Sequence, residues 1–318
     1  NNTIYTYNPS YTASSAGSAY FTPGTYYGDI WGFETEGYFT TDDFVWDSNA
    51  GKYVYANGVA DQTGLESGNF HYGPGDVRFK DLNGDGVINN GDPNMVDAEG
   101  NKIPVGTMAN HGDLKVIGNA LPRYEYSFHL GGAWKNFDID FFFQGVGKRN
   151  MWATGSTIVP MSQSGYGTFT NQLSYNKVEY GADGRITNAF ISEDNTYPRM
   201  YSGAGVTGRI GNIGTGCYNF YPQSRYLMNM SYLRLKNLTV GYTLPVELTK
   251  KALIQRARLY FSADNLCFLY NGAKKYQLDA EMMTSAGSSQ QGNNGSNATF
   301  GRTVPMQRVL SFGIQVTF

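Results

Sequence analysis

The chain has 318 residues, a formal net charge of -2 and 16% charged residues, whereas typical soluble domains carry roughly 25%. This charge balance excludes a nucleic-acid-binding surface, which needs clustered Lys and Arg. Aromatic residues reach 15% and glycines number 40, yet the mean hydropathy is -0.40. No run of about 18 apolar residues exists, so the sequence predicts no transmembrane helix. The composition instead favours β-strands with one apolar face, joined by long polar loops.

The first part of the chain is predicted to be mostly loop, with a dense aromatic segment at 25–41. Trp31 in this segment and Trp152 further on are both expected on loops, where their rings are candidates for contact with a sugar ligand. Packing within the loops is the alternative, because aromatic side chains do this routinely. Trp134 lies beside a predicted turn and is typical of an aromatic girdle at a membrane interface.

Residues 76–92 hold the most specific motif. With Asp81 as position 1 of a twelve-residue loop, oxygen-bearing side chains fall at the alternating positions that ligate Ca²⁺, and Gly86 allows the sharp turn at position 6. The predicted calcium ligands are Asp81, Asn83, Asp85, the backbone carbonyl of Val87 and Asp92, with Asn89 acting through water. No long amphipathic helix flanks the loop, so a structural cation that fixes the loop is expected. An Asx-rich turn cluster without metal remains open.

A β-hairpin is predicted at 123–144. Tyr124, Tyr126 and Phe128 alternate with polar residues before Lys135 and Asn136, and the alternation continues after this turn. Two alternating runs around so short a turn predict antiparallel strands. The apolar face of this hairpin is unusually rich in aromatic rings.

Long loops and short connections alternate after the hairpin. A loop at 147–222 leads to a strand at 225–243, whose apolar phase slips by one residue and predicts a bulge near Asn237. A short helical turn follows Pro245, and a strand is predicted at 256–269. A second long loop precedes a closing strand at 308–318, which has one apolar face. Long loops on one side and short turns on the other are typical of an outer-membrane barrel.

The sequence offers no persuasive active site. His71, His111 and His129 are the only histidines, and none has metal-ligand spacing. Cys217 and Cys267 have neither metal spacing nor an evident catalytic partner, and either one disulfide or two thiols would fit them. The nucleophile, phosphate-loop and zinc-helix motifs are absent. The prediction is therefore that the protein is not an enzyme.

Four stretches together resemble the carboxy-terminal part of the SusC/RagA-type TonB-dependent outer-membrane transporters. In chain order they are Ile-Trp-Gly-Phe-Glu-Thr-Glu-Gly-Tyr-Phe at 30–39, Gly-Asp-Val-Arg-Phe-Lys-Asp-Leu-Asn-Gly-Asp-Gly-Val-Ile-Asn at 75–89, Tyr-Leu-Arg-Leu-Lys-Asn-Leu-Thr-Val-Gly-Tyr at 232–242 with Phe-Ser-Ala-Asp-Asn-Leu at 261–266, and the Phe-rich terminal strand. They span nearly the whole of residues 1–318. The calcium-like loop alone would not be specific.

The resemblance implies an all-β, transmembrane antiparallel barrel of roughly 22 strands. This chain would supply the last strands at 123–318, while the amino-terminal plug would lie outside it. The implied function is outer-membrane import of oligosaccharides or oligopeptides, driven by a TonB complex that acts through the plug. The implied partners are a SusD-like lipoprotein lid, a second transporter–lipoprotein pair and outer-membrane lipid.

The resemblance also sets the expected orientation. The loops, including 76–92, would be extracellular, and the carboxy terminus would be periplasmic. The polar side chains expected to face the lumen are Asp138, Asp140, Arg234, Arg258, Tyr260 and Asp264.

Two other function classes stay open at this point. A secreted, calcium-pinned β-sandwich adhesin or glycan-binding module would share the alternation of the strands. A β-rich glycosidase would need a carboxylate pair whose separation the sequence does not give. Uncharged rows of rings favour the barrel over the sandwich, because a soluble sandwich needs a polar outer face.

Overall fold

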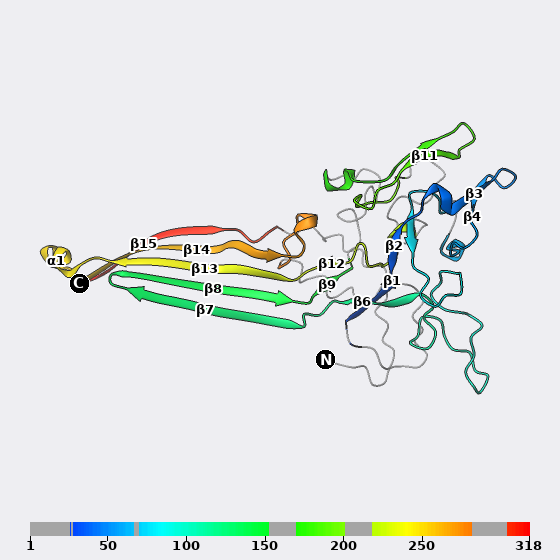
Figure 1. Ribbon diagram of the computed structural model, residues 1–318. Helices are drawn as coiled ribbons and strands as arrows, with labels where there is room; N and C mark the ends of the chain where they lie inside the picture. The colour runs from blue at the N-terminus through cyan, green and yellow to red at the C-terminus, as the bar shows by residue number, and fades with distance from the viewer. Residues whose placement is uncertain (1–25, 27, 67–69, 153–169, 201–217, 282–303) are drawn as a thin grey trace. The chain divides into compact units, whose positions relative to one another are not determined.

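The computed structural model divides the chain into two compact units (Figure 1). Unit 1 comprises Asn1–Leu121, Met151–Met228 and Ala286–Arg302, and unit 2 comprises Pro122–Asn150, Asn229–Ser285 and Thr303–Phe318. The residues that the structure describes are 26, 28–66, 70–152, 170–200, 218–281 and 304–318. No helix in these residues is long and apolar enough to cross a membrane.

Unit 2 is built on one antiparallel five-stranded sheet, with the strand order β15-β14-β13-β8-β7 (Figure 1). Its strands are β7 (Tyr124–Trp134), β8 (Phe137–Gly147), β13 (Tyr232–Thr243), β14 (Arg256–Asn271) and β15 (Val309–Thr317). The predicted hairpin, the two later strands and the closing strand are thus confirmed. The predicted all-β fold class is also confirmed, and the sheet is partial, not closed into a barrel within this chain.

Both short connections and the end of the closing strand share one end of this sheet. The β7–β8 turn consists of Lys135 and Asn136, and the carbonyl of Asn136 accepts a hydrogen bond from the Thr243 N–H at 2.8 Å. Between β13 and β14 the chain forms α1 (Val246–Thr249) and the 3-10 helix η5 (Lys250–Ala252), as predicted. The Gln255 N–H then donates to the carbonyl of Thr317 at 2.9 Å. At the other end of β14 lies the 3-10 helix η6 (Lys274–Tyr276).

The predicted bulge in β13 is confirmed. The pairing of β13 shifts between Leu235 and Asn237 toward both of its neighbours, β8 and β14. An extra residue in a strand changes which face the following side chains occupy. Leu233 and Leu235 before the shift therefore share a face with Leu238 and Val240 after it.

Unit 1 contains four small antiparallel sheets of two strands each among its described residues. The pairs are β1 (Asp29–Phe33) with β6 (Leu114–Asn119), β2 (Thr35–Tyr38) with β5 (Val77–Phe79), β3 (Phe44–Asp47) with β4 (Lys52–Tyr55), and β10 (Lys177–Tyr180) with β11 (Ile186–Phe190). The shorter elements of unit 1 are η1 (Thr41–Asp43), η2 (Thr63–Leu65), η3 (Thr170–Leu173) and η4 (Tyr218–Phe220). A further two-stranded sheet pairs β9 (Asn150–Met151) with β12 (Met228–Asn229).

Stacked aromatic rings form the core of unit 1. Phe33 of β1 stacks on Phe79 of β5 with ring centroids 4.9 Å apart, and Phe39 meets Phe44 edge-on at the same distance. Both rings of the first pair are fully buried. Pairs in these geometries stabilise a core beyond their buried area, by about 0.5–1.5 kcal/mol each. The aromatic segment predicted at 25–41 is therefore core-forming.

The prediction of a continuous loop over 147–222 is wrong in its middle. The strands β10 and β11 form a hairpin there, closed by a turn in which the Gly181 N–H donates to the Arg185 carbonyl and Gly184 has φ 79°. Each strand is only four or five residues long, so its alternation is too short to stand out. Residues 153–169 and 201–217 lie outside the described residues.

Candidate functional site

One face of the unit 2 sheet is apolar across all five strands. Cross-strand partners in an antiparallel sheet point to the same side, so the pairing defines continuous rows of side chains. Three successive rows, starting from the short-turn end, are Trp134, Phe137, Tyr242, Leu259 and Ile314; Gly132, Ile139, Val240, Phe261 and Phe312; and Leu130, Phe141, Leu238, Ala263 and Leu310. None of these positions is charged. We call this surface the apolar face.

The apolar face is exposed. Phe312 is 83% exposed, Trp134 70% and Ile314 69%. Ring contacts run along the face, with Phe128 stacked on Phe143 at 4.6 Å and Phe261 tilted against Phe312 at 5.0 Å. Exposed apolar patches beyond a few hundred Å² mark interaction or membrane surfaces. A patch that crosses five strands is therefore a candidate surface for contact with lipid or another protein.

The opposite face of the same sheet is polar. Arg258 of β14 forms an ion pair with Asp138 of β8, with a 3.0 Å bond from Nε to Oδ1. His129 Nε2 lies 2.5 Å from Asp140 Oδ2, and Asn237 Nδ2 donates to Asp264 Oδ1 at 2.7 Å. The structure thus brings the predicted lumen-facing residues of these strands together on one face, which we call the polar face.

The Asp138–Arg258 pair is possible because Gly241 has no side chain. Arg258 reaches across β13 at Gly241, and a Cβ on this glycine would collide with both the guanidinium and the Asp138 carboxylate. The ring of Tyr260 likewise lies against Gly313 of β15. Glycines at these two positions thus leave room for the large polar side chains of the neighbouring strands.

A second cluster lies on the polar face near the other end of β13. Arg234 donates to Asp279 at 2.7 Å and to Glu281 at 2.6 Å, and Lys236 donates to Glu281 at 2.6 Å. The guanidinium also lies 3.8 Å from the centroid of the Phe268 ring. Arg234 is buried, so both carboxylates neutralise a desolvated charge. The cluster fixes the segment after η6 to β13.

The calcium-like loop is closed by its own side chains. The Asp81 carboxylate accepts the N–H groups of Gly84 and Gly86 at 2.7 and 2.8 Å. Asn83 Oδ1 accepts the Asp85 N–H, and Asp85 Oδ1 accepts the Val87 N–H. These are the Asx turns that the sequence allowed as an alternative to metal. They bring Asp81, Asn83 and Asp85 together at one exposed tip.

The structure does not bring Asp92 to this tip. Its carboxylate accepts the Asn94 N–H at 2.8 Å, and its own N–H donates to Asn110 Oδ1. Among the described residues, no three side chains of His, Cys, Asp or Glu form a group that could hold a metal ion. The oxygens of Asp81, Asn83 and Asp85 suit a hard cation, but the shell predicted with Asp92 is not assembled here. Calcium binding by this loop stays a prediction.

A single buried carboxylate clamps the base of the loop. Asp113 accepts the N–H of Leu82 at 2.8 Å and the N–H of Asn89 at 2.9 Å. Burial raises the pKa of Asp113, the two N–H donors lower it, and the negative charges of Asp81 and Asp85 raise it further. Ile88 is also fully buried, and its N–H donates to the Asp61 carbonyl. The loop is thus held on unit 1 at its base and open at its tip.

The tryptophans occupy different environments from those expected. Trp31 lies in β1, is only 4% exposed and packs with its ring centroid 5.6 Å from that of His111. Its predicted position on a loop is therefore wrong, because Trp31 lies in a strand that pairs with β6. Trp152 is half-buried directly after β9. Ligand contact by either ring stays a prediction, whereas Trp134 is exposed at the turn end of the apolar face.

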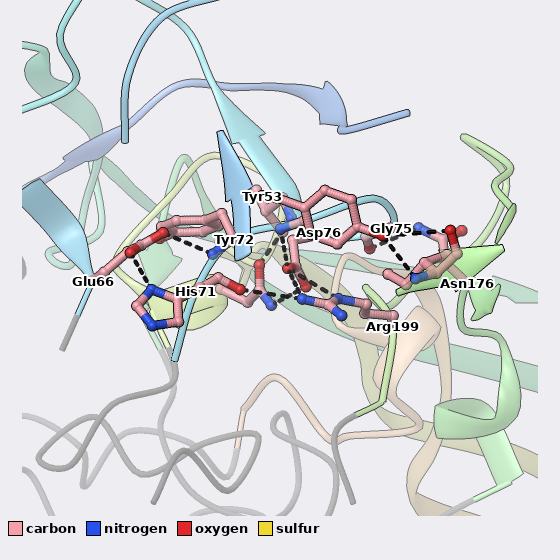
Figure 2. A network of polar contacts seen from close by, with 12 residues as sticks. Tyr53, Glu66, His71, Tyr72, Gly75, Asp76, Asn176 and Arg199 are labelled. Carbon is pink, nitrogen blue, oxygen red and sulfur yellow. Dashed lines mark hydrogen bonds and ion pairs between the residues drawn. The ribbon is translucent and has the colours of Figure 1, made fainter. Parts of the chain in front are cut away.

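A buried ion pair in unit 1 joins segments that are far apart in the sequence (Figure 2). Arg199 donates to Asp76 through Nε at 3.0 Å and Nη2 at 2.7 Å, and Asn219 Nδ2 donates to Asp76 Oδ1 at 2.9 Å. Arg199 also donates to the His71 carbonyl and to the Tyr180 hydroxyl. No local pattern in the sequence pointed to Arg199, which lies 123 residues from Asp76. Its role is to fix the chain around 70–77.

Of the two cysteines, Cys267 carries a free thiol on β14. Cys217 lies outside the described residues.

Replacement of the clamp should release the calcium-like loop. In the full-length protein, Asp113→Ala removes the acceptor of two hydrogen bonds to a charged group, each contributing about 1.5–3 kcal/mol. Amide hydrogen exchange at Leu82 and Asn89 should accelerate by roughly tenfold or more. Asp47→Ala is the matched control, because Asp47 accepts two backbone N–H groups on an exposed turn. Unchanged exchange at both amides in Asp113→Ala would contradict the clamp.

Comparison with known proteins identifies relatives of the chain. It is 27% identical over 251 residues to "TonB-dependent receptor P3" of Formosa agariphila, and 24% identical over 249 residues to "TonB-dependent receptor P26" of the same organism. Each match covers 77% of this chain and only 19% and 20% of the relatives. The chain thus spans about a fifth of the length of these proteins. No family model matches it.

Solved structures with similarity to the chain include the RagAB peptide importer in its open-open state, at 17% identity and a TM-score of 0.42, covering 97% of this chain and 24% of that one. The RagAB peptide transporter matches at 18% identity and a TM-score of 0.39, covering 85% and 22%. On the sequence matches to the two receptors, the chain is a homologue of the TonB-dependent receptors.

Proposed function

We propose that the chain forms part of the wall of an outer-membrane barrel that imports oligosaccharides or oligopeptides in a TonB-dependent manner. The apolar face of unit 2 would meet lipid, and the polar face would line the lumen. The observation that carries this proposal is the uncharged apolar face, five strands wide and exposed. Homology to TonB-dependent receptors supports the same class of function.

The strand lengths support a membrane-spanning role. A transmembrane β-strand needs about 9–11 residues. The strands β7 and β8 have 11 residues each, β13 has 12 and β15 has 9. An apolar face of this height would cross the hydrocarbon layer, and the ion pairs of the polar face would remain in water.

The connections support an orientation. In outer-membrane barrels the short turns are periplasmic and the long loops are extracellular. The Lys135–Asn136 turn, the α1–η5 connection and the end of β15 lie together, so this end is assigned to the periplasm. The segments that follow β8 and β14 are assigned to the outside, and unit 1 supplies the longest of them.

The partners follow from the resemblance at 30–39, 75–89 and the later strands. We infer a SusD-like surface lipoprotein as a lid, a TonB complex that acts through a plug outside this chain, and a dimer of transporter–lipoprotein pairs. We propose no enzymatic activity, in agreement with the names of the two relatives, which describe receptors.

Extraction and uptake test this function together. The full-length protein should remain in the membrane fraction of its cells and enter solution only with detergent. Deletion of the gene should abolish energy-dependent uptake of either labelled oligosaccharides or labelled oligopeptides. A monomer that stays soluble without detergent would overturn the barrel and favour the alternative of a secreted, calcium-pinned sandwich.

We also propose that Ca²⁺ fixes the tip of the 76–92 loop through Asp81, Asn83, Asp85 and the Val87 carbonyl. A cation there would offset the negative charges of Asp81 and Asp85, which contribute to the raised pKa of Asp113. Chelator should make this loop of the full-length protein more sensitive to protease, and Asp81→Ala with Asp85→Ala should be equally sensitive with and without chelator. Equal sensitivity of the unchanged protein with and without chelator would count against the cation.

A further inference from the structure

The short connection between β13 and β14 exposes large apolar side chains. Val246 is 49% exposed, Leu248 59% and Leu253 88%. Thr249 is buried and holds the turn through a hydrogen bond from its hydroxyl to the Val246 carbonyl. Leu253 is almost fully exposed, so its side chain adds little to the packing of the connection itself.

Leu253 is also held in an unfavourable backbone conformation. Its φ is 59° and its ψ is 28°, the left-handed region that glycine or asparagine adopts at lower cost. The conformation ends η5 and directs the chain toward β14. A leucine at this position, almost fully exposed, indicates that its side chain has an apolar partner outside the chain.

Lysines lie in the same connection and on the neighbouring turn. Lys250 and Lys251 lie in the last turn of η5 and are exposed, and Lys135 lies on the neighbouring β7–β8 turn with its Nζ 4.5 Å from the Trp134 ring centroid. Glu247 is the one carboxylate in the described connection from 244 to 255. The combination of apolar side chains with lysines is typical of segments that lie in a membrane interface.

The connection is attached to the sheet at one end of the apolar face. The hydrogen bonds of Thr243 to Asn136 and of Gln255 to Thr317 fix its two ends to the last row of the sheet. That row contains Trp134 and Phe137, which are exposed aromatic residues at the end of the strands. Aromatic residues at strand ends occupy the headgroup level of a bilayer.

We propose that the Val246–Ala252 helical connection and Leu253 lie in the interface of the membrane and bind anionic phospholipid. Val246, Leu248 and Leu253 would enter the boundary of the acyl chains, and Lys250 and Lys251 would contact headgroup phosphates. This inference rests on the proposed function, because it needs the apolar face to lie in lipid. It adds a lipid-binding site on the leaflet at the short-turn end of the sheet.

Fluorescence quenching separates the inference from the proposed function. The full-length protein would be reconstituted in vesicles of phosphatidylcholine brominated on its acyl chains, with the emission of the unchanged protein subtracted. The added emission of both Leu253→Trp and Phe312→Trp should be quenched. Quenching of Phe312→Trp alone would overturn the interfacial connection and leave the barrel wall intact, whereas quenching of neither would overturn both.

Lipid preference tests the role of the lysines. Each lysine at an anionic surface contributes roughly a fivefold preference, so Lys250→Gln with Lys251→Gln should reduce binding of phosphatidylglycerol over phosphatidylcholine by roughly twenty-five-fold. The readout is native mass spectrometry of the full-length protein. Lys274→Gln with Lys275→Gln is the matched control, because it alters two adjacent exposed lysines of η6 at the opposite end of β14. An equal loss in both variants, or a loss in neither, would overturn the site.

Discussion

The bulge in β13 keeps the two faces of the unit 2 sheet distinct. Without the extra residue between Leu235 and Asn237, one half of this central strand would present its leucines to the polar face. Both neighbouring strands, β8 and β14, pair with β13. A shift of the β13 side chains to the wrong face would therefore mix apolar and polar side chains on both faces of the sheet. The separation of an apolar face from a face of ion pairs therefore depends on one irregularity of the backbone.

Two clusters of charged side chains organise the polar face. Arg258 reaches Asp138 because Gly241 leaves room between β14 and β8. Arg234 is instead buried beneath the segment that follows η6, between Phe268 and two carboxylates. One pair spans the sheet, and the other cluster fixes a connecting segment onto it. Together they give the proposed lumen a fixed charge pattern at both ends of β13.

The sequence predicted the elements whose pattern is local. The period of two and the short Lys135–Asn136 turn were enough for the hairpin, and a slip of phase was enough for the bulge at Asn237. The Asx turns of the calcium-like loop were also visible as an alternative, because each spans only a few residues. In all these cases the forces that set the structure act between near neighbours in the chain.

The features that the sequence did not predict depend on distant partners. Trp31 is buried, and its ring packs near that of His111, a residue far along the chain. The Asp113 clamp joins residues 24 and 31 positions apart, and Arg199 meets Asp76 across 123. Nothing in the local sequence distinguishes these side chains from solvated ones. Tertiary contacts, not propensity, determine their roles.

Charge placed on either side of β15 tests the two-faced sheet most directly. Phe312 and Ser311 are neighbours on one strand and face opposite sides, opposite Phe261 and Ser262. In the full-length protein folded in lipid vesicles, Phe312→Arg should lower the free energy of unfolding by about 2–4 kcal/mol, the cost of arginine near the bilayer midplane. Ser311→Arg should change it by less than about 1 kcal/mol, since lumen-facing positions tolerate charge. Equal costs for the two variants, or a larger cost for Ser311→Arg, would contradict the account.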